Sequence, residues 1–127
     1  MQGSGRILIV EDHADSRQLL ARLLEAAGYT VCECDSMATA VAACEREIFP
    51  VAIIDLGLPD GDGIQLLQAI NGHRPTKSIA LTGNNDPEIV RSCMEAGFCR
   101  HVLKPIEVEL LLEMIQEYGP LAESGCR

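Results

Sequence analysis

Short apolar runs alternate along this chain with segments whose apolar residues recur every three or four positions. Runs of four or five residues, typical of buried strands, occur at Arg6–Val10, Thr30–Cys34, Val51–Ile54, Ser78–Thr82 and Arg100–Leu103. After each run the apolar spacing becomes that of an amphipathic helix. The pattern therefore predicts a strand followed by a helix, five times over.

Capping signals bound several of these predicted helices. Asp35-Ser36 and Asp86-Pro87 are start signals, the second with a proline in the first turn. Gly28 and Gly97 are stop signals. The last helix is expected to run to about Tyr118.

The order of elements predicts an α/β fold. Strands that alternate with helices form a parallel sheet covered on both faces, and right-handed crossovers leave few layouts open. One of these is the doubly wound, flavodoxin-like five-stranded sheet in the order 2-1-3-4-5. Residues 6–119 are expected to form this domain, with 1–5 as a flexible leader or expression remnant and 120–127 as a C-terminal tail.

The net charge of the chain indicates which classes of partner it can bind. The chain of 127 residues has 19 acidic and 10 basic residues, for a net charge of -9. This balance disfavours nucleic acid and anionic membranes as direct partners. Since we also find no apolar run of about 20 residues and no signal peptide, the expected location is the cytoplasm.

The cysteine pattern gives no sign of a metal site. The six cysteines form no CxxC pair, so we interpret them as small buried hydrophobes, except Cys126, which is expected to be an exposed thiol. Cys32 and Cys34 are expected to share one face of a strand.

Polar residues follow four of the predicted strands: Glu11, Asp12, Asp55, Thr82 and Lys104. In the order 2-1-3-4-5 they meet at one edge of the sheet. Three carboxylates packed together repel one another, and a hard divalent cation such as Mg²⁺ relieves this. Lys104 and Thr82 suit phosphate oxygens, so the set favours phosphoryl transfer. A single Asp at a strand end, such as Asp12 taken alone, would favour a helix cap, but five residues of these types together favour a site.

Four segments in order make the sequence similar to a known family. They are Ile7–Asp12, Ile53–Gly63, Ala80–Gly83 and Leu103–Pro105. Together they resemble a two-component response-regulator receiver domain, and the resemblance extends from about Arg6 to Tyr118.

The resemblance implies a role for each acidic residue. Asp55 matches the phosphoacceptor, which takes a phosphoryl group from the phosphohistidine of a histidine kinase. Glu11 and Asp12 match the pair that binds Mg²⁺, and Gly57 stands where a backbone carbonyl usually joins the metal.

Three further positions carry implied roles. Thr82 matches the hydroxyl residue that swings toward the phosphoryl group, and Lys104 matches the phosphate-contacting lysine. The Lys104-Pro105 bond corresponds to one that is typically cis in the family. The switch position three residues before the lysine usually holds Tyr or Phe, whereas here it holds His101. His101 either swings inward or stays in solvent.

Two other positions depart from the family pattern. Gly57 places no side chain over the phosphorylation site, and Asn84 is small and polar. In the family, the side chains at these positions tune hydrolysis of the phosphoaspartate.

The implied function is that of a phosphoacceptor signalling domain, not an enzyme beyond its self-catalysed phosphorylation and dephosphorylation. Its expected partners are a sensor histidine kinase or phosphotransfer protein. A weak homodimer through the fourth helix, fifth strand and fifth helix is also expected. The chain is either a stand-alone receiver or part of a larger protein, and Ala80–Gly83 favours the receiver of a hybrid histidine kinase.

Three other functions fit the pattern less well. An FMN carrier needs a phosphate-cradling loop after the first strand, where the anionic Glu11-Asp12 would repel phosphate. A haloacid-dehalogenase-type phosphatase needs two aspartates two positions apart there. A pseudo-receiver usually lacks Asp55 or Lys104, and both are present.

Overall fold

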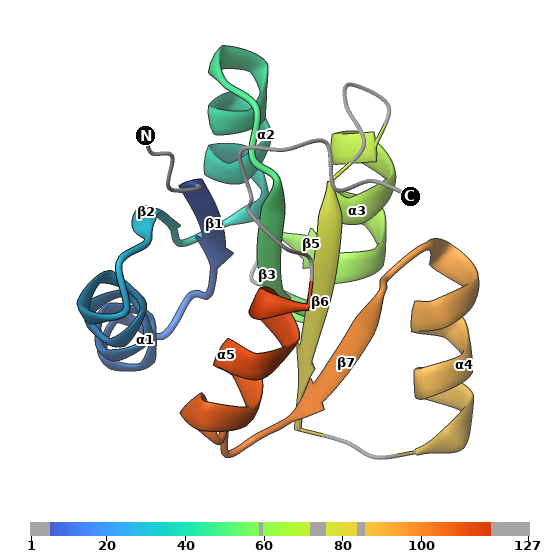
Figure 1. The fold of residues 1–127 in the computed structure, drawn as a ribbon. Helices are drawn as coiled ribbons and strands as arrows, with labels where there is room; N and C mark the ends of the chain where they lie inside the picture. The colour runs from blue at the N-terminus through green and yellow to red at the C-terminus, as the bar shows by residue number, and fades with distance from the viewer. Residues whose placement is uncertain (1–5, 59, 72–75, 84–85, 118–127) are drawn as a thin grey trace.

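A computed structural model describes residues 6–58, 60–71, 76–83 and 86–117 of the chain. Five parallel strands form one sheet in the order β2-β1-β3-β6-β7, which confirms the predicted doubly wound layout (Figure 1). The sheet strands are β1 (Arg6–Val10), β2 (Thr30–Cys34), β3 (Val51–Asp55), β6 (Lys77–Thr82) and β7 (Arg100–Leu103). The helices are α1 (Ala14–Ala26), α2 (Met37–Arg46), α3 (Gly63–Asn71), α4 (Pro87–Ala96) and α5 (Val108–Gln116).

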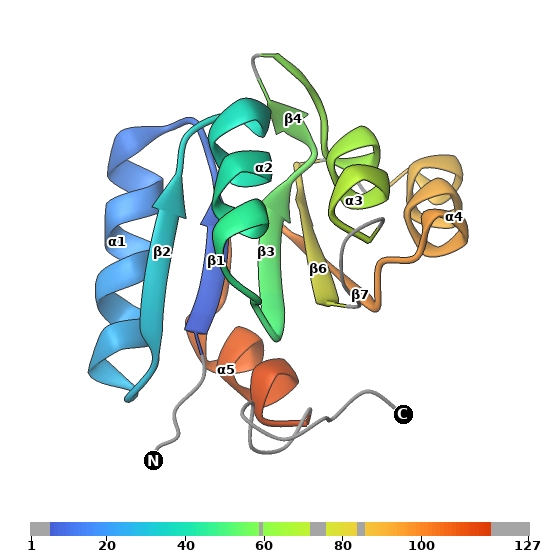
Figure 2. The same cartoon turned by 90° about the horizontal axis from the view of Figure 1, so that it is seen from above.

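Helices cover both faces of the sheet (Figure 2). One apolar cluster joins the sheet to α2, α3 and α4, and a second joins it to α1 and α5. The central strands are buried on both sides, which explains their uninterrupted apolar sequence. In the described ranges, no helix is long and apolar enough to cross a membrane.

Helix ends follow the expected signals. Ser36 caps α2 in a reciprocal capping box with Thr39. Asp86 caps α4 ahead of Pro87, and Gly97 ends that helix at φ 117°, a conformation that favours glycine. The described part of α5 ends at Gln116, and Tyr118 lies outside the described residues.

A small hairpin replaces part of the predicted loop after Asp55. The short strands β4 (Gly57–Leu58) and β5 (Gly61–Asp62) pair antiparallel. Asp60 ties this hairpin to α2, because its carboxylate accepts the backbone N–H groups of Met37 at 2.8 Å and Ala38 at 3.1 Å. The hydrogen bond from the backbone of Met37, which outweighs desolvation, and that from Ala38 lower the pKa of Asp60.

The described cysteines are free thiols. Cys34 and Cys93 are buried as predicted, whereas Cys32, Cys44 and Cys99 are half-buried. Burial raises the pKa of the Cys34 thiol to about 12. Cys126, like the segments 1–5 and 120–127, lies outside the described residues.

Gly63 has no room for a side chain. A Cβ at this position would lie 2.8 Å from Leu56 Cδ2 and 3.1 Å from the carbonyl oxygen of Asp55. Gly63→Ala is therefore expected to destabilise the fold by about 1–3 kcal/mol, because the backbone of the functional loop must move. Urea denaturation measures this loss. Gly83→Ala is the control, since its Cβ would meet no described atom within 4 Å. Equal stability of the two variants would contradict the prediction.

Candidate functional site

The sheet register brings the predicted site residues to one edge. Val10 pairs with Ile54, Asp55 with Leu81, and Thr82 with Leu103. Glu11, Asp55, Thr82 and Lys104 therefore lie at or just beyond the carboxyl ends of four neighbouring strands. Ligands of doubly wound sheets bind at this edge, where the strand order reverses.

Lys104 links the two buried carboxylates. Its Nζ donates to Asp55 Oδ2 at 3.0 Å and to Glu11 Oε1 at 3.1 Å. Partial burial lowers the pKa of the ammonium group, but the hydrogen bonds to Asp55 and Glu11 outweigh this effect, so the pKa lies above its ordinary value. Lys104 consequently carries its charge throughout the physiological pH range.

Asp55 is held from two sides. Its Oδ1 accepts the backbone N–H of Gly57 at 3.1 Å, while Oδ2 accepts Lys104. The residue is only 6% exposed. The orientation of the carboxylate is thus fixed, at the carboxyl end of β3.

The acidic pair comes from the turn between β1 and α1. Glu11 is buried, and Arg17 supports the turn because its Nη1 donates to the carbonyl oxygen of Glu11 at 3.0 Å. Asp12 Oδ1 is shielded from solvent and has no hydrogen-bond partner among the described residues. A buried carboxylate oxygen without a hydrogen bond is costly, and a bound cation would remove that cost.

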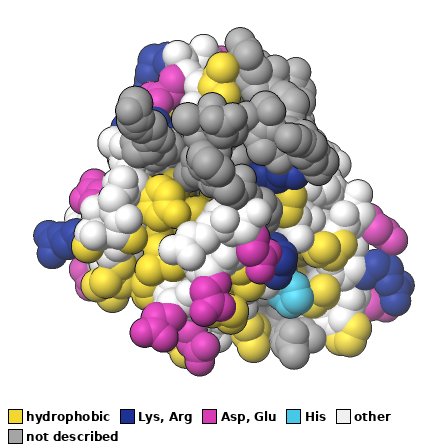
Figure 3. Space-filling view, in the orientation of Figure 1, with side chains coloured by type: hydrophobic (Ala, Val, Ile, Leu, Met, Phe, Trp, Pro, Cys, Tyr) yellow, Lys and Arg dark blue, Asp and Glu magenta, His cyan; other side chains and the backbone are white. Residues whose placement is uncertain are grey.

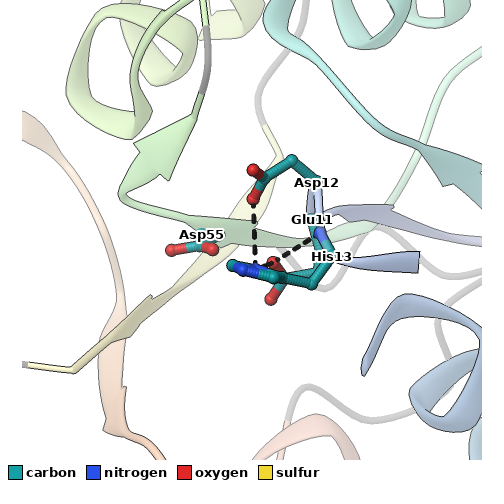
Figure 4. Close-up of side chains that lie close together, drawn as sticks. All are labelled: Glu11, Asp12, His13 and Asp55. Carbon is teal, nitrogen blue, oxygen red and sulfur yellow. Dashed lines mark hydrogen bonds and ion pairs between the residues drawn. The ribbon is translucent and has the colours of Figure 1, made fainter. Parts of the chain in front are cut away.

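The structure adds His13 to the residues predicted for this cluster. Glu11, Asp12, His13 and Asp55 each offer one ligand atom, and these atoms lie within 4.8 Å of one another (Figure 4). The carboxylates fit a hard divalent cation such as Mg²⁺. The sequence signal for His13 is its position directly after the acidic pair Glu11-Asp12.

The remaining predicted residues lie at the margin of this cluster. Thr82 is buried at the end of β6, and the backbone N–H of Lys104 donates to its carbonyl oxygen at 2.8 Å. The Lys104-Pro105 bond is cis, as the resemblance implied. His101 is half-buried on β7 and lines a hollow of about 350 Å³ with Leu103 and Leu110. Asn84 lies outside the described residues.

Comparison with known proteins identifies the family. The chain matches the response regulator receiver domain over residues 7–116. It belongs to this family. The match favours a receiver over the FMN-carrier and phosphatase alternatives.

The receiver domain is similar to proteins of several kinds. It is 30% identical to the sensory/regulatory protein RpfC of Xanthomonas campestris over 90% of this chain and 16% of that protein. It is 33% identical to the acid tolerance regulatory protein ActR of Rhizobium meliloti over 92% of this chain and 61% of that protein. The chain thus spans less than two thirds of these relatives.

Solved structures agree with the fold. A CheY-like receiver domain from Methanospirillum hungatei has a TM-score of 0.85 and 34% identity, covering 90% of this chain and 92% of that one. The chemotaxis response regulator CheY4 of Vibrio cholerae has a TM-score of 0.83 and 26% identity, covering 90% of this chain and 98% of that one. These similarities agree with the predicted receiver architecture.

Proposed function

We propose that this receiver domain accepts a phosphoryl group on Asp55, in an Mg²⁺-dependent reaction, from the phosphohistidine of a histidine kinase or phosphotransfer protein. The observation that carries the proposal is the position of Lys104 Nζ, 3.0 Å from Asp55 and 3.1 Å from Glu11. Asp55 lies 49 positions and Glu11 93 positions from Lys104 in the chain, so only the fold brings these charges together.

The transfer step forms one bond and breaks one. A carboxylate oxygen of Asp55 attacks phosphorus, and the new O–P bond forms as the P–N bond of the donor phosphohistidine breaks. The electron pair of that bond returns to the donor imidazole. Gly57 N–H holds Oδ1 of Asp55, so the carboxylate meets the phosphoryl group in a fixed orientation.

Charge neutralisation supports this step. Mg²⁺, held by Glu11, Asp12 and Asp55 with the carbonyl of Gly57, would supply positive charge against the incoming phosphoryl oxygens. Lys104 then exchanges a contact with the carboxylate for one with a phosphoryl oxygen. Labelling by acetyl phosphate with and without Mg²⁺ tests the proposal. An equal extent of labelling in the two conditions would contradict it.

Phosphorylated Asp55 signals through contacts that the unphosphorylated domain does not make. Thr82 moves toward the phosphoryl oxygens, and His101 follows into the space that Thr82 leaves. Such contacts shift a two-state equilibrium by their differential energy. The affected surface is α4, β7 and α5.

This surface carries exposed apolar residues on each of its elements. They are Met94, Leu103 and Leu110 on α4, β7 and α5. Figure 3 shows the face that includes α5, with hydrophobic side chains near its border with α1 and acidic side chains over α5. We expect phosphorylation to strengthen self-association through α4, β7 and α5.

Sedimentation with and without beryllofluoride, a phosphoryl mimic, measures this association. Leu110→Glu is expected to abolish the increase, because it places a charge among the apolar contacts. Leu19→Glu is the matched control, since Leu19 is an exposed leucine on α1. A protein that stays monomeric with the mimic would leave only docking to a different partner.

The relatives support a proposal about the larger protein to which this domain belongs. One of them, 30% identical over 118 residues, is named sensor histidine kinase AruS of Pseudomonas aeruginosa, and this chain spans 12% of that protein. We propose that this domain is the receiver of a hybrid histidine kinase and works in the cytoplasm.

A further inference from the structure

His13 turns back toward the acidic cluster instead of capping its own helix. It occupies the N-cap position of α1, yet its side chain makes no capping hydrogen bond. Its Nδ1 lies 3.2 Å from Glu11 Oε2 and 3.5 Å from Asp12 Oδ1 (Figure 4). Because the side chain is 73% exposed, apolar burial does not account for this orientation.

The cluster therefore combines three oxygen donors with a nitrogen donor. One atom from each of Glu11, Asp12, His13 and Asp55 lies within 4.8 Å of the others. Tetrahedral ligands at 2.0–2.2 Å from a single ion lie about 3.3–3.6 Å apart. Side-chain shifts of about 1 Å would therefore bring all four atoms to a common ion.

The other contacts leave ligand atoms available. Lys104 engages one oxygen of Glu11 and one of Asp55. The second oxygens accept the backbone N–H groups of His13 at 3.2 Å and Gly57 at 3.1 Å, and each keeps a further lone pair for a metal. Asp12 Oδ1 is shielded and lacks a hydrogen-bond partner among the described residues. This oxygen lies 3.5 Å from His13 Nδ1, an ion-pair contact that is not a hydrogen bond.

Nitrogen donors change the preference for a metal. Mg²⁺ prefers oxygen ligands and keeps several waters, whereas imidazole is a common ligand of Zn²⁺. Four protein ligands close the shell of Zn²⁺, while a reactive site keeps a position open.

We propose that His13 is a metal ligand that makes this site bind Zn²⁺ in preference to Mg²⁺, and that the Zn²⁺-bound domain resists phosphorylation. With His13 and three carboxylates around the ion, no position is left for a phosphoryl oxygen, and Asp55 is engaged as a ligand. The inference rests on the proposed function, since it uses the same carboxylates.

Calorimetric titrations with Zn²⁺ and Mg²⁺, with thiols kept reduced, test the ligand. Wild type is expected to bind Zn²⁺ at least about tenfold more tightly than Mg²⁺, and His13→Asn to lose about tenfold or more of the Zn²⁺ affinity with Mg²⁺ affinity unchanged. Asparagine is a favoured N-cap, so this variant keeps α1 intact. His101→Asn is the matched control, because it removes a histidine that is not part of the cluster, and it should bind Zn²⁺ and Mg²⁺ with the affinities of wild type.

Co²⁺ provides a spectroscopic readout independent of phosphorylation. Its visible absorption should respond to His13→Asn and lack sulfur charge-transfer bands, which would arise if the cysteines held the metal. In parallel, Zn²⁺ should suppress acetyl phosphate labelling of wild type in Mg²⁺ buffer and suppress it far less in His13→Asn.

Each outcome separates this inference from the proposed function. Equal Zn²⁺ affinity in wild type and His13→Asn, thiolate bands, or labelling indifferent to bound Zn²⁺ would overturn the inference while Mg²⁺-dependent labelling stands. Failure of wild type to bind either metal would overturn both.

Discussion

Replacing Asp55 with asparagine abolishes labelling by acetyl phosphate, so that acid-labile, hydroxylamine-sensitive phosphate falls to background. The amide keeps the shape of the carboxylate and can still accept the N–H of Gly57, which holds Oδ1 at 3.1 Å in the native site. It is a far weaker nucleophile because it carries no negative charge. Intact-mass measurement and radiolabel counting would both record the loss.

Asp62→Asn is the matched control for this experiment. Asp62 is an exposed carboxylate in the hairpin, and its Oδ1 accepts the backbone N–H of Gln65 at 2.8 Å. We expect this variant to be labelled as wild type is. Equal labelling of the Asp55 and Asp62 variants would show that phosphate is bound elsewhere, and the assignment of Asp55 would be wrong.

Replacing Asp12 with alanine weakens Mg²⁺ binding by at least about tenfold and slows labelling in parallel, because a hard cation loses a charged ligand. The physical basis is the shielded Oδ1, which has no hydrogen-bond partner among the described residues. Since the chain has no tryptophan, calorimetry is the measurement of choice. The Mg²⁺-dependent rise in melting temperature should shrink as well, because ligand stabilisation depends on affinity.

Asp15→Ala controls for the change in net charge. Asp15 is an exposed acidic residue in the first turn of α1, three positions from Asp12. Its removal changes the overall charge equally but takes no ligand from the cluster. If both alanine variants bound Mg²⁺ as wild type does, Asp12 would have no part in holding the ion.

Local sequence signals predicted most of the scaffold. The apolar runs in β1, β3 and β6 are legible because strands buried on both faces tolerate few polar residues. Parallel strands expose their carboxyl ends at one edge, so the positions of Glu11, Asp55 and Lys104 after their strands already implied a common site. The contacts of Lys104 agree with this reasoning.

Other features depend on geometry that no local pattern encodes. The hydrogen bonds from the backbone of Met37 and Ala38 to Asp60 join residues 23 and 22 positions apart. Leu19 and Met94 belong to apolar helical repeats but are exposed. Their exposure depends on how much of the surface of α1 and α4 packs against the sheet. Helical spacing gives the direction of a side chain relative to its helix and says little about the width of the buried stripe.

The sequence by itself determined the alternation of strands and helices, the parallel sheet and the residue types at its carboxyl edge, because these follow from periodicity and chain direction. Only the tertiary structure decided that Lys104 bridges Asp55 and Glu11, that Asp12 keeps an oxygen without a hydrogen-bond partner among the described residues, and that the His13 ring joins the carboxylates. Each of these depends on side-chain torsions and on distances between separate strands. A change of about 1 Å in those distances would make or break a contact while leaving the hydrophobic pattern of the chain unchanged.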